Sequence, residues 1–253
     1  MSRPAPVLRS VGALAAHELR LTARRGENVL VTIVIPIAVL LFFAGTSVIP
    51  NAAGRSVDFL LPGAIALGII ASGLVNLGIA TAYERSYGVL KRLGGAPLPR
   101  WALLAAKGIS VLVLELVQIV ALITIGVVIL GWAPGSGWSP LLFGLTVLLG
   151  TATFVSLGLL LAGTLRAEAT LALANGLFLG FLMLGGIVLP IDHLPEALQP
   201  IAALLPSTAL ADLLRISLAS AVPAATSAAS SAAILAAWAI GAVALTIRTF
   251  RWE

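Results

Sequence analysis

Residues 116–165 form a stretch of fifty residues without a single charged side chain. A soluble domain carries roughly 25% charged residues, whereas this chain of 253 residues carries 10% and is 60% hydrophobic. A helix that crosses a bilayer needs about 20 consecutive apolar residues. The chain is therefore predicted to be an all-α integral membrane protein whose main solvent is lipid.

The fifty-residue stretch is long enough for two spanning helices, and a turn divides it. Its centre, Trp132–Trp138, combines Pro and Gly, which favour a turn, with tryptophans of the kind found at membrane interfaces. Other charge-free stretches have the length of single spans. Six transmembrane helices are predicted: Val29–Ile49, Phe59–Ala82, Leu103–Trp132, Pro140–Leu165, Ala169–Leu189 and Val222–Ile247.

Lysine and arginine divide unequally between the two sides of this six-helix arrangement. One side holds Arg3, Arg9, Arg20, Arg24, Arg25, Arg85, Lys91, Arg92, Arg100, Lys107, Arg166, Arg248 and Arg251, and the other holds only Arg55 and Arg215. Because positively charged segments stay in the cytoplasm, both termini are predicted to be cytoplasmic. The basic residues thus sort by membrane side, and no nucleic-acid partner is expected.

These spans divide one transmembrane domain, residues 1–253, into segments. The predicted segments are a cytoplasmic helix (1–28), the first two spans (29–82), a cytoplasmic connection (83–100), spans three to five (101–189), an external re-entrant stretch (190–221), the last span (222–247) and a cytoplasmic tail (248–253).

The N-terminal segment has the pattern of an amphipathic helix. Its apolar residues recur at helical spacing on one face, and basic and polar residues occupy the other. Such a helix beside a span is typical of one that lies in the lipid headgroup plane. It is either a general topology anchor or a lever that joins the spans to a cytoplasmic partner. The apolar face consists of Val7, Leu8, Val11, Leu14, Ala15 and Leu19, and the polar face of Arg9, Ser10, His17, Arg20 and Arg24.

The connection 83–100 is the sizeable polar segment between spans on the predicted cytoplasmic side. Gly88 permits a bend after the second span, and the Gly and Pro residues from Gly94 to Pro99 end any helix there. Between them, Val89, Leu90 and Leu93 alternate with Lys91 and Arg92. A short amphipathic helix of this kind suits docking into a groove of another protein. The simpler reading is a basic segment that contacts lipid headgroups alone.

This connection resembles the same position in the membrane permeases of type-2 ATP-binding-cassette (ABC) exporters, especially the drug-resistance permeases. In that family it reads roughly Glu-Arg-Glu-x-Gly-Thr-Leu-Lys-x-Leu-x-x-x-Pro. Ser86 replaces the second acidic residue and Val89 replaces the threonine, which removes one charge and one hydroxyl. The matching residues are Glu84, Arg85, Gly88, Leu90, Lys91, Leu93 and Pro97.

The resemblance implies one permease half of an exporter. A second permease, identical or paralogous, would complete the pathway, and the connection would couple it to a nucleotide-binding ATPase subunit. The chain contains no Gly-x-x-x-x-Gly-Lys-Ser/Thr segment that could cradle phosphates, so ATP and magnesium are expected on that partner and no cofactor on this chain. The implied coupling residues are Glu84, Arg85, Gly88, Leu90, Lys91, Arg92, Leu93 and Pro97.

A few polar residues fall inside the predicted spans. An acid at the centre of a span costs roughly 2.5–3.5 kcal/mol on insertion scales, so Glu115 is a functional candidate, with Gln118 one turn further on the same face. Alternatively, Glu115 is protonated or paired with a neighbouring helix. Asn76 and Asn175 can form hydrogen bonds between helices, and all four residues are candidates to line the substrate pathway. The glycines at 63, 68, 73 and 78 recur every five residues, which does not keep to one face of an α-helix.

The external stretch 190–221 is too apolar for a free loop and too often broken by proline to span the membrane. It is predicted to form short helices at the outer interface, with Asp192 and Ser207 as helix caps. The family resemblance implies that it covers the pathway externally, although a simple surface connector fits as well. Asp212 and Arg215 are spaced to pair, as an exposed pair of little energetic weight.

The predicted function is therefore export of a hydrophobic or amphipathic substrate, drug or lipid-like, by a permease that is not itself an enzyme. The alternatives are a secondary transporter or channel half that uses Glu115, and a polysaccharide-exporting permease. A membrane-embedded enzyme or metal site is disfavoured, because the chain has no cysteine, no histidine within a span and no paired carboxylates there. The excess of arginine over lysine favours a bacterial cytoplasmic membrane.

Overall fold

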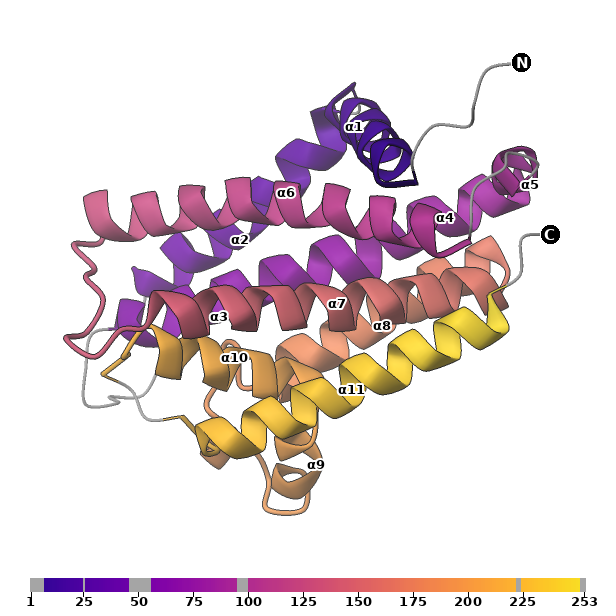
Figure 1. Cartoon of the computed structure of the whole chain (residues 1–253). Helices are drawn as coiled ribbons and strands as arrows, with labels where there is room; N and C mark the ends of the chain where they lie inside the picture. The colour runs from indigo at the N-terminus through magenta and orange to yellow at the C-terminus, as the bar shows by residue number, and fades with distance from the viewer. Residues whose placement is uncertain (1–6, 25, 46–55, 95–99, 222–223, 251–253) are drawn as a thin grey trace.

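A computed structural model describes residues 7–24, 26–45, 56–94, 100–221 and 224–250. Within these ranges every regular element is a helix and there is no strand, which confirms the all-α prediction (Figure 1). The elements are α1 (Val7–Arg24), α2 (Gly26–Ala44), α3 (Ser56–Ile70), the π-helix η1 (Ala71–Asn76), α4 (Leu77–Ser86), α5 (Val89–Gly94), α6 (Arg100–Val128), α7 (Pro140–Thr164), α8 (Ala167–Leu184), the 3-10 helix η2 (Ile191–His193), α9 (Gln199–Ala203), α10 (Pro206–Ser217) and α11 (Ala228–Thr249).

Five helices in the described part of the chain are long and apolar enough to cross a membrane. They are Ser56–Ser86, Trp101–Val128, Pro140–Thr164, Ala167–Leu184 and Ala228–Thr249, and they correspond to the predicted second to sixth spans. The predicted first span overlaps α2, whose apolar part Thr32–Ala44 is shorter. The end of that predicted span, from residue 46, lies outside the described residues.

Local sequence signals explain where the spans begin and end. α7 begins at Pro140 as predicted, because the Ser139 side chain accepts a hydrogen bond from the Leu142 amide and proline suits the first helical position. α8 ends at Leu184, five residues before the predicted end, where Gly186 takes a positive φ of 63°. α11 begins six residues later than predicted, at Ala228.

The turn between α6 and α7 differs from the prediction in one respect. α6 ends at Val128, so the span stops before Trp132. Trp132 is buried in the core, whereas Trp138 is exposed. Only Trp138 can therefore serve as the interfacial aromatic residue that the sequence predicted at both ends of the turn.

The second span continues through the π-helix η1, which brings glycines spaced five apart onto one neighbour. A Cβ atom on Gly73 would lie 2.8 Å from the Val155 nitrogen, and one on Gly78 would lie 3.1 Å from the Gly158 Cα, both in α7. A π-helix has i to i+5 hydrogen bonds, so a spacing of five keeps to one face there. The expectation that these two glycines lie on different faces is wrong.

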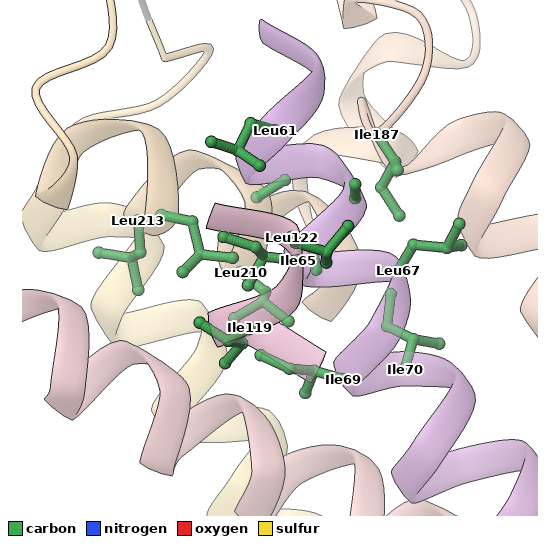
Figure 2. Close-up of a cluster of buried hydrophobic side chains, with 14 of the residues drawn as sticks. Leu61, Ile65, Leu67, Ile69, Ile70, Ile119, Leu122, Ile187, Leu210 and Leu213 are labelled. Carbon is green, nitrogen blue, oxygen red and sulfur yellow. The ribbon is translucent and has the colours of Figure 1, made fainter. Parts of the chain in front are cut away.

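α3 lies at the centre of the protein, and almost all of its residues are buried. The largest hydrophobic cluster joins its side chains to those of α6 and α10. In Figure 2, Leu61, Ile65 and Ile69 of α3 lie beside Leu122 of α6 and Leu210 of α10. The second span is therefore the core around which the other helices pack.

The two ends of the helix bundle carry different elements. α5, the end of α4 and the last turn of α11 lie at one end, and the connection between α6 and α7 lies at the other (Figure 1). α1 packs across the start of α6, where the predicted apolar face contributes Val11 and Ala15 to a cluster with Ala102 and Ala106. The predicted amphipathic helix is present, and its buried residues contact a span.

The external stretch forms the short helices η2, α9 and α10, but two details of the prediction are wrong. Neither Asp192 nor Ser207 caps a helix, since η2 and α10 begin without a side-chain cap. Asp212 and Arg215 do pair, but they are 0% and 4% exposed rather than at the surface. α10 is packed among α3, α7 and α11, so its charged pair is removed from water.

Candidate functional site

A buried lysine joins three helices at the end of the bundle where α5 lies. The Lys107 ammonium in α6 lies 3.0 Å from the Glu18 Oε1 in α1 and 2.7 Å from the Glu84 Oε2 in α4. The lysine side chain is 1% exposed, and the two glutamates are partly buried. We call Glu18, Lys107 and Glu84 the junction cluster.

Helix spacing brings the junction cluster together. Ala102 and Ala106 of α6 are small enough for α1 to approach closely through Val11 and Ala15. Glu18 follows Ala15 by three residues and so lies on the face of α1 that contacts α6, where it reaches the Lys107 ammonium. An apolar contact between α1 and α6 therefore sets the geometry of the ionic one.

The junction cluster is tied together by electrostatics, not only by packing. A charge taken out of water is tolerated when it is paired and hydrogen-bonded, and removing one partner of such a pair costs about 3–5 kcal/mol. Two carboxylates share one ammonium, which leaves a formal net charge of −1. α1, α4 and α6 are thus coupled, because moving any one of these helices separates at least one carboxylate from the Lys107 ammonium.

Arg85 connects the same end of α4 to the other half of the bundle. Its guanidinium donates a hydrogen bond to the carbonyl oxygen of Leu165, at the C-terminal end of α7. Carbonyl groups at a helix C-terminus carry partial negative charge, so a cation there is stabilising. Glu84 and Arg85 therefore bind neighbours on different sides of α4, the first at α1 and α6 and the second at the turn between α7 and α8.

Gly88 makes the predicted bend between α4 and α5. Its φ of 71° is a left-handed conformation that glycine adopts without steric cost. α4 ends at Ser86, and α5 begins at Val89 and ends at Gly94, where the glycine and proline residues predicted a stop.

α5 turns one face into the protein and another outward. Leu90 is fully buried and belongs to a hydrophobic cluster with Leu103, Leu159 and Phe250. Tyr87 and Val89 are 74% and 41% exposed, and Lys91 is exposed as well. Leu90 therefore holds α5 in place, while its exposed neighbours form the outer face.

The remaining predicted coupling residues are only partly described. Arg92 and Leu93 belong to α5, but their side chains lie outside the described part of the structure, as does the whole of Pro97. Their role stays a prediction.

Glu115 and Gln118 lie inside the protein between α6 and its neighbours. One Glu115 carboxylate oxygen accepts a hydrogen bond from the Thr151 hydroxyl of α7, and the other has no partner among the described residues. Both polar atoms of the Gln118 side chain also lack a described partner, and this side chain lies against Gly68 of α3. The pairing of Glu115 with a neighbouring helix, given as the alternative above, is thus observed.

The two asparagines occupy different environments. Asn76, at the end of η1, donates a hydrogen bond of 2.7 Å to the Thr32 hydroxyl of α2, as expected for a polar link between helices. Asn175 lies on the exposed face of α8 and donates to the Leu171 carbonyl of its own helix, which differs from the predicted link. A pathway role for either residue stays a prediction.

At the opposite end, Asp212 and Arg215 connect α10 to its neighbours. Asp212 accepts hydrogen bonds from the backbone amides of Ala225 and Thr226, at 3.2 and 3.0 Å, just before α11. Arg215 donates to the Gly186 carbonyl beyond α8, and its guanidinium carbon lies 4.0 Å from the centre of the Phe59 ring in α3. The external stretch is thereby fastened to three spans.

Sequence reasoning missed Glu18 altogether and counted Lys107 only as a topology charge. Signals for both were present, since Glu18 is the one acid of a basic helix and Lys107 is the one lysine within an apolar helix. Two opposite charges at unusual positions, both near the predicted cytoplasmic boundary, are a reason to expect a pair.

Comparison with known proteins gives the family. A family model described as "ABC-2 type transporter" matches residues 9–219, from α1 through α10. The chain belongs to the ABC-2 type transporter family. As an ABC-2 protein it is a multi-pass membrane permease, a non-catalytic transmembrane subunit of a transporter that functions with nucleotide-binding ATPase subunits.

Named relatives of this ABC-2 permease agree with the family. It is 27% identical over 192 residues to the putative transport permease YvfS of Bacillus subtilis. The aligned residues make up 75% of this chain and 78% of YvfS. It is 34% identical over 137 residues to the putative transport permease ycf38 of Porphyra purpurea, covering 53% and 47%. It is 27% identical over 159 residues to the probable multidrug ABC transporter permease YbhS of Escherichia coli, covering 62% and 42%.

Proposed function

We propose that this ABC-2 permease is half of an exporter in which the junction of α4 and α5 receives the movement of a separate ATPase subunit. The observation that carries the proposal is Lys107, buried between the carboxylates of Glu18 and Glu84. These charges connect the residues next to α5 with α1 and α6. A displacement of α5 would therefore move α4 directly. Through Glu84 and Lys107 it would also act on α6 and α1.

The outer face of α5 supports a docking role. Tyr87, Val89 and Lys91 combine an aromatic, an apolar and a basic side chain on a short exposed segment. Aromatic and apolar residues supply contact area at protein interfaces, and a rim charge sets orientation. ATP and magnesium would bind on the ATPase, and this chain would supply no group to the hydrolysis.

The proposed orientation places α1, α5 and both termini in the cytoplasm. α1, α5 and the last turn of α11, which carry several of the predicted cytoplasmic lysines and arginines, lie toward one end of the bundle (Figure 1). α2 would complete a set of six spans. The bacterial relatives and the excess of arginine over lysine favour a bacterial cytoplasmic membrane.

The proposed substrate is hydrophobic or amphipathic, drug or lipid-like. Apolar side chains dominate the described spans, and one relative is named a multidrug permease. A second permease, identical or paralogous, would complete the pathway, and the α10 segment fastened by Asp212 and Arg215 would cover it outside. The secondary-transporter alternative required ion coupling through Glu115. An ABC-2 permease functions with an ATPase subunit, so the proposed transport needs no such coupling.

The test of ATPase docking compares two charge reversals on the same membrane side. Lys91→Glu alters the exposed face of α5, and Arg248→Glu alters the exposed last turn of α11. The tagged permease is purified from its native host under gentle conditions, and the recovered ATP-binding-cassette subunit is quantified by mass spectrometry. We expect Lys91→Glu to lower recovery about tenfold, as a loss of about 1.4 kcal/mol would.

Arg248→Glu should leave recovery unchanged, because Arg248 belongs to α11 and is not part of the exposed face of α5. Equal losses in both variants would indicate a general effect of charge on insertion. Full recovery with Lys91→Glu, and also with a Val89→Asp variant, would overturn the assignment of this face to the ATPase.

A further inference from the structure

A cavity lies beside the junction cluster. It has a volume of about 100 Å³, is partly open, and is lined by residues of α1, α2, η1, α4 and α6. Glu18, Glu84 and Lys107 form its charged part, and Ser72 and Asn76 lie in its polar part. Most of its other described lining residues are apolar. This volume limits any bound group to a small headgroup, and the open side leaves room for an attached chain to extend outward.

The charged part of the cavity has an unbalanced charge. The two glutamates share the single ammonium of Lys107, and that ammonium is already hydrogen-bonded to both. Arg85, the next cation along α4, is bound instead to the Leu165 carbonyl. One negative charge therefore remains in a partly buried site, where electrostatic interactions are stronger than in water.

A second observation indicates an unfilled position in the same cavity. Ser72 is 4% exposed and lines the cavity, and its hydroxyl has no hydrogen-bond partner among the described residues. Buried polar groups are nearly always hydrogen-bonded, so a hydroxyl without a partner that faces a cavity indicates a missing water or ligand. The described lining has no aromatic side chain, so a cation would be held by charge rather than by an aromatic cage.

We propose that this cavity binds the headgroup of a cationic amphiphile, an organic cation with an apolar chain, beside Glu18 and Glu84. The carboxylates supply the charge complementarity, and the apolar lining residues Leu21, Ile33 and Leu114 contact the start of the chain. Only the export of such a molecule rests on the function proposed above, because binding itself needs no ATPase.

The test measures binding to the purified permease in a neutral maltoside detergent. The probe is radiolabelled decyltrimethylammonium, and the comparison is decyl sulfate, which has the same chain and the opposite charge. We expect saturable binding of the cation and none of the anion. Glu18→Gln removes the net charge but keeps a hydrogen-bonding side chain, and it should weaken binding at least about tenfold.

Two further variants distinguish the effect of charge from that of cavity shape and from a general effect of losing an acid. Ala80→Phe fills the cavity without changing charge and should also weaken binding of the cation at least about tenfold. Glu168→Gln removes an acid from the exposed first turn of α8, away from the cavity, and should bind as the unaltered protein does. Equal binding of anion and cation, absence of binding, or unchanged binding in both Glu18→Gln and Ala80→Phe would overturn the proposal.

The source of the cation is decided by extracting lipids from the same purified proteins. An amine-bearing lipid that the unaltered permease retains and Glu18→Gln loses would identify a membrane lipid as the ligand. No such lipid, together with binding of the added probe, would identify a soluble amphiphile. The binding assay contains no ATPase, so its failure would leave the docking test of Lys91→Glu unaffected, and the reverse also holds.

Discussion

At the scale of single residues, Lys107 is the side chain on which the junction cluster depends. It lies in an apolar helix, and its only described partners for the charge are the two glutamates. A lysine buried without partners would lose its charge or unfold its surroundings. The pairing therefore explains how a cation is tolerated inside the bundle and why α1 stays against α6.

Replacing Lys107 by methionine should destabilise the permease by about 3–5 kcal/mol, because Glu18 and Glu84 would face each other without a cation. Thermal unfolding of the purified protein in detergent measures the change. The matched control is Lys91→Met, which removes an exposed lysine with no described ion pair. Similar melting temperatures for Lys107→Met and the unaltered protein would contradict the structural role of the cluster.

Gly158 allows a close approach between the second span and α7. A Cβ atom there would lie 2.3 Å from the Gly73 carbonyl oxygen, which is too close for any side chain. Gly158→Leu should therefore cost at least about 1–3 kcal/mol, the usual range for overpacking. Gly144→Leu is the control, since Gly144 is in the same helix with open space around it. Melting temperatures that fall equally would show that leucine in α7, rather than the close approach, is the cause.

At the scale of elements, the bend between α4 and α5 decides where the proposed docking face points. A residue with a Cβ atom pays about 1–2 kcal/mol to adopt the left-handed conformation of Gly88. Gly88→Ala should therefore loosen α5 while α6 keeps its structure. Faster amide hydrogen exchange confined to Val89–Gly94 is the expected result.

Gly12→Ala is the control for this element, because Gly12 lies in α1 with open space around it and no positive φ. Alanine there should leave exchange in α5 unchanged. Unaltered exchange of α5 in Gly88→Ala would show that the bend does not depend on the glycine.

The positions of most spans follow from local sequence. Charge-free length predicted five helices that the structure contains, and α7 begins at Pro140, the predicted start of the fourth span. The burial of Asp212 and Arg215 could not be predicted in this way. Their partners, Gly186, Phe59 and Thr226, come from three distant segments, and no periodicity in the sequence reports such contacts.

The candidate site was predictable to a similar degree. The family-like segment indicated Glu84, Arg85 and the bend at Gly88, and all three have structural roles. The inward direction of Leu90 was not predictable, because a six-residue helix with apolar and basic residues has no fixed orientation until its neighbours are known. Leu90 therefore acts through the position of α5, and Val89 and Lys91 are the residues to vary in docking tests.

At the scale of the whole molecule, polar contacts hold neighbouring helices together at each end of the bundle, and the hydrophobic core around the second span lies between them. Charges at one end join α1, α4 and α6, and charges at the other join α10 to α3, the end of α8 and the start of α11. α3 and α4 belong to one continuous helix of 31 residues. In the proposed mechanism, a displacement of α4 at the end next to α5 would pass along this helix to the core around α3.

The most direct test of this account is site-specific cross-linking in membranes of the native host. The chain has no cysteine, so one introduced cysteine gives this protein a single attachment site for a photo-activated cross-linker. Val89→Cys places it on the exposed face of α5, and Leu141→Cys places it on an exposed position at the other end of the bundle. We predict that the first cross-links to an ATP-binding-cassette subunit and the second does not. Cross-links from position 89 to lipid alone, in membranes where the ATPase still co-purifies with the permease, would contradict the account.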